Sequence, residues 1–371
     1  MSSRVPKTKM NKPGWLKAGK TILSSDDLLK GVLLPSFSLQ ETNAVQFCSS
    51  WLSGQQSFNF QTSGSTGIPK KISFRRDQLL SSALLTQKAL QYESGNTALI
   101  CLDVNFIAGA MMLVRSMVSG LNMVIVSPSS DPLEGVFDKI DFAAFVPLQV
   151  ATLLASSNKK INGIKTFIVG GAPLNPGMLQ ALQDFPGSAF ATYGMTETIS
   201  HIALQKLNGP DRQDFFEALP GVSLDTDERG CLTIQSDHLG VQPVVTQDRV
   251  TLVGKNKFHW LGRADQIINS GGIKIQPREI ESIVQFFFEG HQIKNRFFVA
   301  GVPDAHLGQK VVLIVEGSLD QNLSTALQKE FQVRLSRYEI PQQIIICKQF
   351  SETATQKIDR MATLTLLKDP G

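Results

Sequence analysis

Between Asn96 and Thr192 the sequence alternates short apolar runs with amphipathic stretches of helical length. Strands that are apolar throughout are buried on both faces, and intervening helices supply the crossovers that parallel strands need. The expected strands are residues 97–104, 122–126, 142–146, 166–169 and 189–192, and the expected helices are residues 107–119, 149–156 and 175–185. The pattern predicts an α/β domain whose parallel sheet is covered on both faces and whose ligands bind at the carboxyl ends of the strands.

The pattern changes twice after Pro220 and Gly221. Residues 231–234, 241–245, 249–253 and 257–260 are expected to form short strands joined by turns, and so a small β subdomain. From Asp265 onward, strands are expected at residues 296–302, 310–315 and 342–347, and helices at residues 277–287 and 324–335. We therefore predict a large N-terminal domain of residues 1–264 and a small α+β domain of residues 265–371.

Composition restricts the class of function. The 371 residues are 42% hydrophobic and 18% charged, which is enough apolar material for a large core, and the net charge is +4. No basic block carries interleaved aromatic residues, so a nucleic-acid partner is not expected. A mildly basic protein suits an anionic small molecule as substrate.

The four cysteines are scattered and form no paired motif, which favours free thiols in a reducing compartment over zinc or disulfides. The basic N-terminus is followed by no apolar segment of the kind found in signal peptides, and a cleaved transit peptide remains the alternative. No apolar run reaches membrane-spanning length. We expect a cytoplasmic protein without a membrane span.

The first motif with chemical meaning lies at residues 61–70. It consists of Gln61, Thr62, Ser63, Gly64, Ser65, Thr66, Gly67, Ile68, Pro69 and Lys70. Its glycines allow backbone N–H groups to converge on one point, and its hydroxyls and lysine add donors, which together suit phosphate oxygens. Pro69 stands where a Walker loop needs glycine, so an ordinary P-loop is excluded. The alternative is a flexible turn.

The second motif directly follows an apolar run and reads Tyr193-Gly194-Met195-Thr196-Glu197. Tyr193 offers a flat face to a base, Thr196 a hydroxyl to a phosphate, and Glu197 a hard oxygen ligand. Mg²⁺ is commonly bound through one or two carboxylates together with substrate phosphates, so one glutamate is a sufficient protein ligand. The alternative is a strand-to-helix turn with Glu197 in solvent.

Two further motifs lie closer to the C-terminus. Residues 261–274 contain Arg263 and Asp265 and end in a Gly-Gly pair and Lys274, and Asp248 precedes them. A carboxylate can accept both hydroxyls of a ribose, an arginine can reach a phosphate, and charged residues before a Gly-Gly pair suit a hinge. The last motif, residues 353–360, contains Lys357, whose alternative reading is a solvated charge in a tail.

Together, and in this order, the four motifs resemble the signature of the adenylate-forming superfamily of acyl-CoA synthetases, luciferase and peptide-synthetase adenylation domains. The resemblance runs from Gln61 to Arg360. It implies ATP and CoA as co-substrates, Mg²⁺ as the cofactor, and an acid activated as its adenylate.

The resemblance also implies roles for matching residues. The β- and γ-phosphates of ATP would be held by Thr62, Ser63, Gly64, Ser65, Thr66, Gly67 and Lys70. Adenine would lie between Tyr193 and Gly171-Ala172-Pro173, and ribose would bind Asp248 and Arg263. The reacting end would use Thr196 at the α-phosphate, Glu197 at Mg²⁺ and Lys357 during adenylation. Asp265 would be the hinge, and Gly271, Gly272 and Lys274 the face presented to CoA.

Within the superfamily the chain resembles most the o-succinylbenzoate–CoA ligases of menaquinone biosynthesis. The stretches that carry this likeness are residues 169–174, 193–201 and 269–272. The resemblance places Arg115, Gly170 and Ser200 at an aromatic carboxylic acid. For Arg115, the alternative is an ordinary surface arginine on a helix.

The chain departs from the family pattern at some positions. Sixty residues precede Gln61, fewer than the family usually has, so part of the usual N-terminal subdomain is expected to be missing or reduced. Phe106-Ile107-Ala108-Gly109 stands where the family commonly has polar residues near the acid. Two other functions remain open, a CoA ligase for another aryl or medium-chain acid and a non-catalytic nucleotide-binding relative. A kinase or other P-loop NTPase is a third reading, and Pro69 contradicts it. A homodimer is possible.

Overall fold

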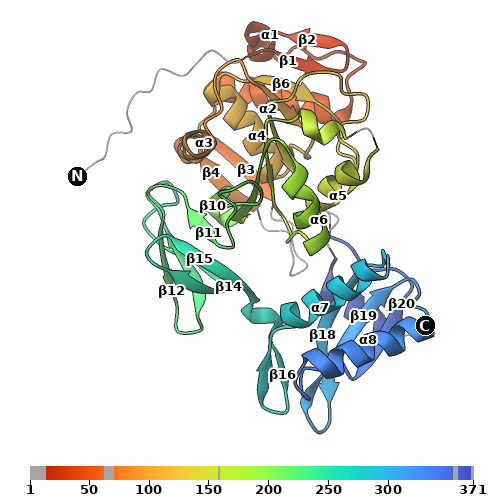
Figure 1. Cartoon of the computed structure of the whole chain (residues 1–371). Helices are drawn as coiled ribbons and strands as arrows, with labels where there is room; N and C mark the ends of the chain where they lie inside the picture. The colour runs from red at the N-terminus through yellow and green to blue at the C-terminus, as the bar shows by residue number, and fades with distance from the viewer. Residues whose placement is uncertain (1–13, 62–70, 158, 354–357, 369–371) are drawn as a thin grey trace.

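The computed structural model describes residues 14–61, 71–157, 159–353 and 358–368. In these residues one sheet of thirteen strands ends, in chain order, with β15 (Lys257–Arg263), and a second sheet of five strands begins with β16 (Ile268–Ser270). The short 3₁₀ helix η4 (Ala264–Gln266) connects the two sheets. Figure 1 shows the second sheet and its helices as a separate body below the first.

The first half of the large sheet is parallel. Its strands are β1 (Leu16–Ala18), β6 (Asn122–Ile125), β5 (Thr97–Ile100), β7 (Phe142–Phe145), β8 (Thr166–Val169) and β9 (Ser188–Gly194), in that spatial order. At the edge β2 (Thr21–Leu23) pairs antiparallel with β1. The predicted α/β class with a parallel sheet is confirmed.

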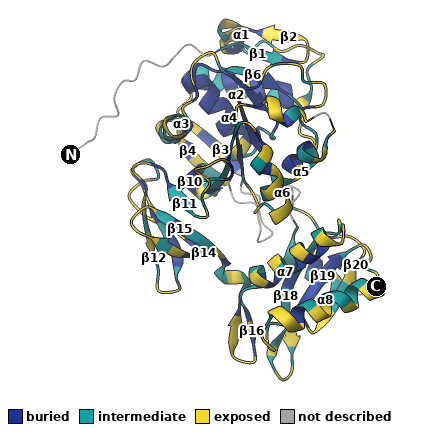
Figure 2. Ribbon diagram, in the orientation of Figure 1, coloured by how far each residue is buried: buried dark blue, intermediate teal, exposed yellow. Residues whose placement is uncertain are grey.

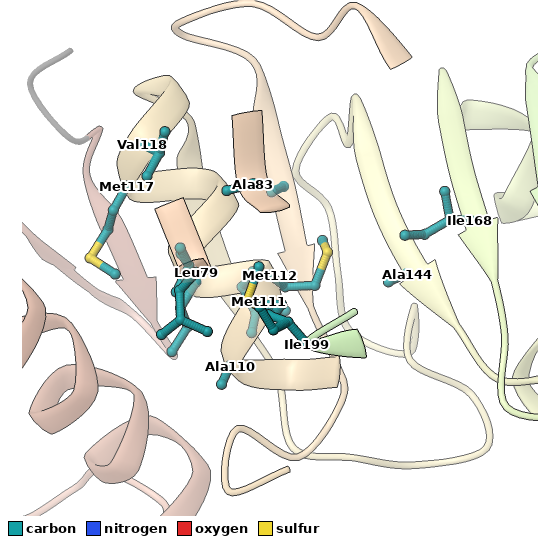
Figure 3. Packing of buried hydrophobic residues seen from close by; sticks show 14 of the residues in the cluster. Leu79, Ala83, Ala110, Met111, Met112, Met117, Val118, Ala144, Ile168 and Ile199 are labelled. Atoms are coloured by element: carbon teal, nitrogen blue, oxygen red, sulfur yellow. The ribbon is translucent and has the colours of Figure 1, made fainter. Parts of the chain in front are cut away.

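Helices cover both faces of this parallel part. One face carries α2 (Leu39–Leu52), α3 (Arg76–Leu90) and α4 (Ile107–Ser119), and α1 (Ser25–Lys30) follows β2. The other face carries α5 (Pro147–Ala155), η1 (Lys160–Gly163), α6 (Pro176–Ala181) and η2 (Leu182–Asp184). Figure 2 shows the buried strands between these layers, and Figure 3 shows the side chains of α3 and α4 that pack on the first face.

The second half of the large sheet is antiparallel. It continues from β9 through β10 (His201–Lys206), β11 (Phe216–Ala218), β15, β14 (Val244–Val253), β13 (Cys231–Gln235) and β12 (Ser223–Thr226). The predicted small β subdomain is therefore continuous with the parallel sheet through β10. This continuity brings β14 and β15 close to the carboxyl end of β9.

A separate hairpin is formed by β3 (Ser57–Gln61) and β4 (Lys71–Arg75), which pair antiparallel. The predicted phosphate-binding loop connects these two strands, and its residues 62–70 lie outside the described residues.

The C-terminal body is an α+β unit. After β16 come β17 (Ile273–Ile275), α7 (Pro277–Gly290), β18 (Phe297–Asp304), β19 (Gly308–Glu316), α8 (Gln321–Arg334), β20 (Gln343–Cys347) and α9 (Arg360–Lys368). The sheet order is β17-β16-β19-β18, and β20 pairs parallel with β19. Separate apolar clusters lie on the two faces of this sheet.

The sequence prediction was wrong at one place in the antiparallel part. The two strands expected at residues 241–245 and 249–253 are a single strand, β14. The polar residues between the two apolar runs stay in the strand because Asp248 and Thr246 are buried and hydrogen-bonded there. The predicted helix at residues 107–119 has the observed bounds of α4.

Two further sequence expectations concern cysteines and membranes. All four cysteines are buried, free thiols. In the described ranges, no helix has both the length and the apolar character needed to cross a bilayer.

Phe167 tests the packing on the second face of the sheet. Its ring is completely buried and packs at 5.5 Å from Phe145 and 5.0 Å from Phe185. Phe167→Ala should lower the free energy of unfolding by about 3–5 kcal/mol, because it removes buried apolar area and leaves a cavity. Urea denaturation measures this loss. The control is Phe137→Ala at a 91% exposed position, which should change little; equal effects of the two changes would contradict the packing described here.

Candidate active site

The second motif lies at the carboxyl end of β9. Tyr193 is buried in this strand, and the 3₁₀ helix η3 (Thr196–Thr198) follows immediately. Thr196 is partly buried and Glu197 is exposed, so both side chains stand at the surface where the parallel strands end. This is the edge at which ligands of such sheets gather.

A strained turn follows η3 and places Ser200. Ile199 has φ 67° and ψ −49°, and the Ser200 N–H donates to the Thr198 carbonyl at 2.7 Å, which closes a γ-turn. A β-branched residue rarely adopts a positive φ. Two features hold Ile199 in this conformation. Its side chain is completely buried in the cluster that includes Met111 and Met112 (Figure 3). The Thr198 hydroxyl accepts a hydrogen bond from the Met195 N–H at 2.9 Å.

The predicted ribose carboxylate, Asp248, is buried in β14 and held by two donors. The Tyr193 hydroxyl donates to Oδ2 at 2.7 Å, and the indole Nε1–H of Trp260 donates to Oδ1 at 3.0 Å. Burial, followed by the charge of Asp248, raises the pKa of Tyr193, so its hydroxyl keeps the proton that it donates. Two predicted nucleotide residues, Tyr193 and Asp248, are therefore in direct contact.

A β-bulge brings Arg263 to the same place. Asp248 pairs with Arg263 and Val250 pairs with Trp260, so β15 has one residue more than β14 over this interval. Trp260 and Arg263 would lie on opposite faces of a regular strand, and the extra residue puts both beside Asp248. Gly262, with φ 133°, lies in the bulge, where a Cβ would lie 3.1 Å from the side chain of Gln276.

The predicted hinge residue contacts the predicted ribose residue. The Arg263 Nε–H donates to Asp265 Oδ1 at 2.9 Å, and this ion pair raises the pKa of Arg263. Asp265 lies in η4, between the two sheets. The predicted CoA face lies beyond it, where Gly271 and Gly272 turn the chain between β16 and β17 with φ 59° and 82°, followed by exposed Lys274.

The predicted adenine-flanking residues lie after β8. Gly171, Ala172 and Pro173 are exposed, and Gly171 has φ 92°. The preceding Gly170 donates its N–H to the Phe145 carbonyl at 3.1 Å, and a Cβ there would lie 2.2 Å from the Thr192 hydroxyl. Gly170 is therefore required by the close approach of β8 and β9.

Arg115 is buried in α4, so the alternative of a surface arginine is wrong. Its side chain is enclosed because α4 packs between the sheet and α3. Nε–H donates to the Thr86 hydroxyl of α3 at 3.3 Å, and Nη2 contacts Ser200 and lies 3.4 Å from His201 Nδ1. Burial lowers the pKa of Arg115 to about 10, so it remains a cation at pH 7. No carboxylate of the described residues pairs with it.

His201 completes this buried cluster as a neutral side chain. Burial, followed by the Arg115 charge, holds the pKa of His201 well below its ordinary value of 6.5. The Thr86 hydroxyl can donate to the Ser82 carbonyl at 3.1 Å, and it then accepts from His201 Nε2–H at 3.2 Å. In that tautomer Nδ1 is an acceptor facing Ser200 and Arg115, and the cluster offers the Arg115 cation and the Ser200 hydroxyl to an anion.

Among the described residues, Glu197 is the one predicted as a ligand of a magnesium ion. The described residues contain no group of three or more His, Cys, Asp or Glu side chains that could hold a metal by themselves. The exposed carboxylate of Glu197 fits an ion whose remaining ligands are phosphate oxygens and water.

Two residues of the candidate site were not predicted from the sequence, and two predicted groups lie outside the described residues. These two residues are Trp260, which contacts Asp248, and Thr86, which contacts Arg115. A tryptophan in a folded protein usually has a partner for its N–H, and this preference could have pointed to Trp260. The predicted phosphate loop and Lys357 lie outside the described residues.

A protein-family model described as "AMP-binding enzyme" matches residues 19–222. Among curated relatives, 2-succinylbenzoate–CoA ligase of Lactococcus lactis is 26% identical over 81% of this chain and 68% of its own length. The Escherichia coli enzyme of the same name is 25% identical over 76% of this chain and 62% of its own length. The chain thus spans about two thirds of the length of these relatives.

Solved structures agree with the fold. An acyl-CoA synthetase (AMP-forming)/AMP-acid ligase II-like protein from Dyadobacter fermentans is 40% identical, with a TM-score of 0.60 over 91% of this chain and 97% of that one. O-succinylbenzoate coenzyme A synthetase of Bacillus subtilis, in complex with ATP and magnesium ion, is 22% identical, with a TM-score of 0.71 over 84% of this chain and 69% of that one.

The neutral state of His201 predicts how stability depends on pH. Below pH 6.5 the unfolded chain protonates this histidine and the folded one does not, so the free energy of unfolding falls as the pH falls. His201→Gln removes this contribution. Its unfolding free energy should fall less steeply than that of the native protein between pH 7 and 5, by up to about 1.4 kcal/mol per pH unit. Urea denaturation at each pH measures both slopes, and parallel curves would contradict a neutral buried His201.

Proposed function

Since the chain belongs to the AMP-binding enzyme family, we propose that it is an ATP-dependent acid:CoA ligase that works through an acyl-adenylate. The membership predicted from the four motifs is confirmed by the family match. The proposed substrate is o-succinylbenzoate, as the names of the curated relatives suggest.

The observation that carries the proposal is the convergence of separate motifs on one carboxylate. Tyr193 comes from the second motif and Arg263 from the third, and both lie beside Asp248. An aromatic ring, a carboxylate with free lone pairs and a guanidinium match the base, ribose and phosphates of a nucleotide.

In the first step a carboxylate oxygen of the acid attacks the α-phosphorus of ATP, and pyrophosphate leaves. Thr196 lies at the strand end where the α-phosphate is proposed to bind, and residues 62–70 are proposed to hold the β- and γ-phosphates. Lys357 is proposed to stabilise the charge that develops during this step. Mg²⁺ bound at Glu197 would neutralise phosphate charge.

In the second step the CoA thiol sulfur attacks the acyl carbonyl carbon of the adenylate, the thiol proton is lost, and AMP leaves. The hinge proposed at Asp265 lets the small domain turn, so that Lys357 withdraws and Gly271, Gly272 and Lys274 face the site. Asp265 pairs with Arg263, so this rotation begins at a residue that contacts the nucleotide site.

Arg115 supports the choice of acid. A buried cation without a carboxylate partner is costly, and an anionic ligand would offset that cost. Ser200 is only partly buried and contacts Arg115, so a carboxylate at Ser200 would lie next to the guanidinium. o-Succinylbenzoate has two carboxylates, and the aromatic one, which does not react, is proposed to bind here.

The first test is the reaction itself. Pyrophosphate release and thioester formation should both require o-succinylbenzoate, ATP and CoA. Lys357→Ala should slow adenylate formation by ~10²–10³-fold, since a preorganised charge is lost, and leave thioester formation from supplied acyl-adenylate largely intact. Release of phosphate instead of pyrophosphate would indicate a kinase-like or NTPase reaction, and binding of ATP without turnover of any acid would indicate a non-catalytic relative.

The second test concerns the substrate. Arg115→Ala should raise the KM for o-succinylbenzoate roughly 10–100-fold, because hydrogen bonds to a charged group are lost, with little change in the KM for ATP. Arg115→Lys should recover only part, since an ammonium cannot form the bidentate fork.

The matched control replaces the acid instead of the residue. 4-Oxo-4-phenylbutanoate lacks only the aromatic carboxylate, so the native enzyme should use it poorly and Arg115→Ala should lose most of the discrimination. An unchanged KM for o-succinylbenzoate in Arg115→Ala would leave a ligase for another aryl or medium-chain acid as the better reading.

A further inference from the structure

Trp260 connects the nucleotide site to the small domain. Its indole Nε1–H donates to Asp248 Oδ1 at 3.0 Å, while the other oxygen of that carboxylate accepts from Tyr193. Two donors on two different oxygens fix the plane of a carboxylate. Asp248 is therefore oriented before any ligand arrives, with its remaining lone pairs available.

Trp260 also contacts Arg278 of the small domain. Arg278, in the first turn of α7, places its guanidinium carbon 4.4 Å from the centre of the Trp260 ring, and its Nη1–H donates to the Trp260 carbonyl. An arginine over an indole face is attracted by the ring, and the hydrogen bond fixes its direction. Small domain, indole and carboxylate thus form one chain of contacts.

The geometry of β15 makes this chain of contacts possible. The bulge places Trp260 on the Asp248 face, and Gly262 lets Gln276 at the start of α7 approach the strand. Movement of α7 relative to β15 would change the Arg278 contact. The chain itself connects Trp260 to α7 through η4 and the β16–β17 hairpin.

We propose that Trp260 is a positioning residue for the ribose site, and that Arg278 makes the orientation of Asp248 depend on the position of the small domain. The proposal rests on the ribose role of Asp248 in the proposed function. A carboxylate whose plane is already fixed binds a ribose cis-diol with a smaller loss of conformational freedom, so affinity for the nucleoside is greatest when the Arg278–Trp260 contact is made. Loss of the Arg278–Trp260 contact after the thioester has formed would loosen the nucleotide, which suits the release of AMP.

The test measures binding of AMP to the intact protein by calorimetry, with no acid present. Trp260→Phe removes the N–H donor and keeps a ring under Arg278, and should raise the Kd for AMP roughly 5–50-fold, as expected for a lost hydrogen bond to a charged group. Arg278→Leu keeps the indole and should raise the Kd for AMP about 2–5-fold. The two changes together should be less than additive, because they act along one path.

The chain offers a matched control for Arg278. Arg76 stacks on Trp51 at 4.0 Å and donates to the Trp51 carbonyl at 2.6 Å, entirely within the large domain. Arg76→Leu removes the same kind of contact and should leave the Kd for AMP unchanged. Arg76→Leu and Arg278→Leu each remove an arginine stacked on a tryptophan. If only Arg278→Leu weakens AMP binding, the cause is the lost link between the small domain and Asp248 and not a general loss of folding.

A comparison of nucleotides separates positioning from a merely structural role. The native protein should bind ATP more tightly than 2′,3′-dideoxy-ATP, and Trp260→Phe should reduce this preference, whereas a general weakening would affect both ligands equally. A folded Trp260→Phe variant with native Kd and native preference would overturn the positioning role. A native Kd for AMP in Arg278→Leu would overturn the proposed dependence of the Asp248 orientation on the small domain. If the native protein shows no preference, the ribose role of Asp248 fails, and the proposal fails with it.

Discussion

The register of β15 against β14 determines what surrounds the carboxylate of Asp248. One extra residue in β15 turns Trp260 and Arg263 to the same face, and both then lie beside Asp248. Because the antiparallel strands continue the parallel sheet through β10, this face is close to Tyr193 at the end of β9. A change in this register would separate Trp260 and Arg263 from the carboxylate of Asp248.

A second constraint is the burial of Arg115 beneath the loop that follows β9. Arg115 is a buried cation in α4, and its neighbours Thr86, Ser200 and His201 are neutral. The strained turn at Ile199 supplies one of them, Ser200, and the packing of Ile199 against α4 holds that turn. The same helix therefore provides the cation and holds the loop against it, so the proposed binding site of the acid depends on core packing.

The sequence predicted the strands of the parallel sheet well because they are short and apolar. The helices between them have apolar residues at regular helical spacing. The helix at residues 107–119 is an example: eleven of its residues are buried and its bounds match those predicted. The small strands near the N-terminus, β1 and β2, were not predicted, since three residues carry too little pattern. Strand β14 was divided in two because the buried Asp248 looks, in sequence, like a residue of an exposed turn.

By itself the sequence determined the family and the chemical types at the site, since glycines, hydroxyls, carboxylates and a lysine in a fixed order constrain the chemistry whatever surrounds them. It also determined the α/β class, because hydrophobic period follows directly from which faces must be buried. Only the tertiary structure decided which side chains meet. Trp260 reaches Asp248 through a bulge, Arg278 reaches Trp260 from another domain, and His201 is neutral because burial and Arg115 make it so. Such contacts depend on strand register, packing and desolvation, which arise between segments distant in the chain and have no local signature.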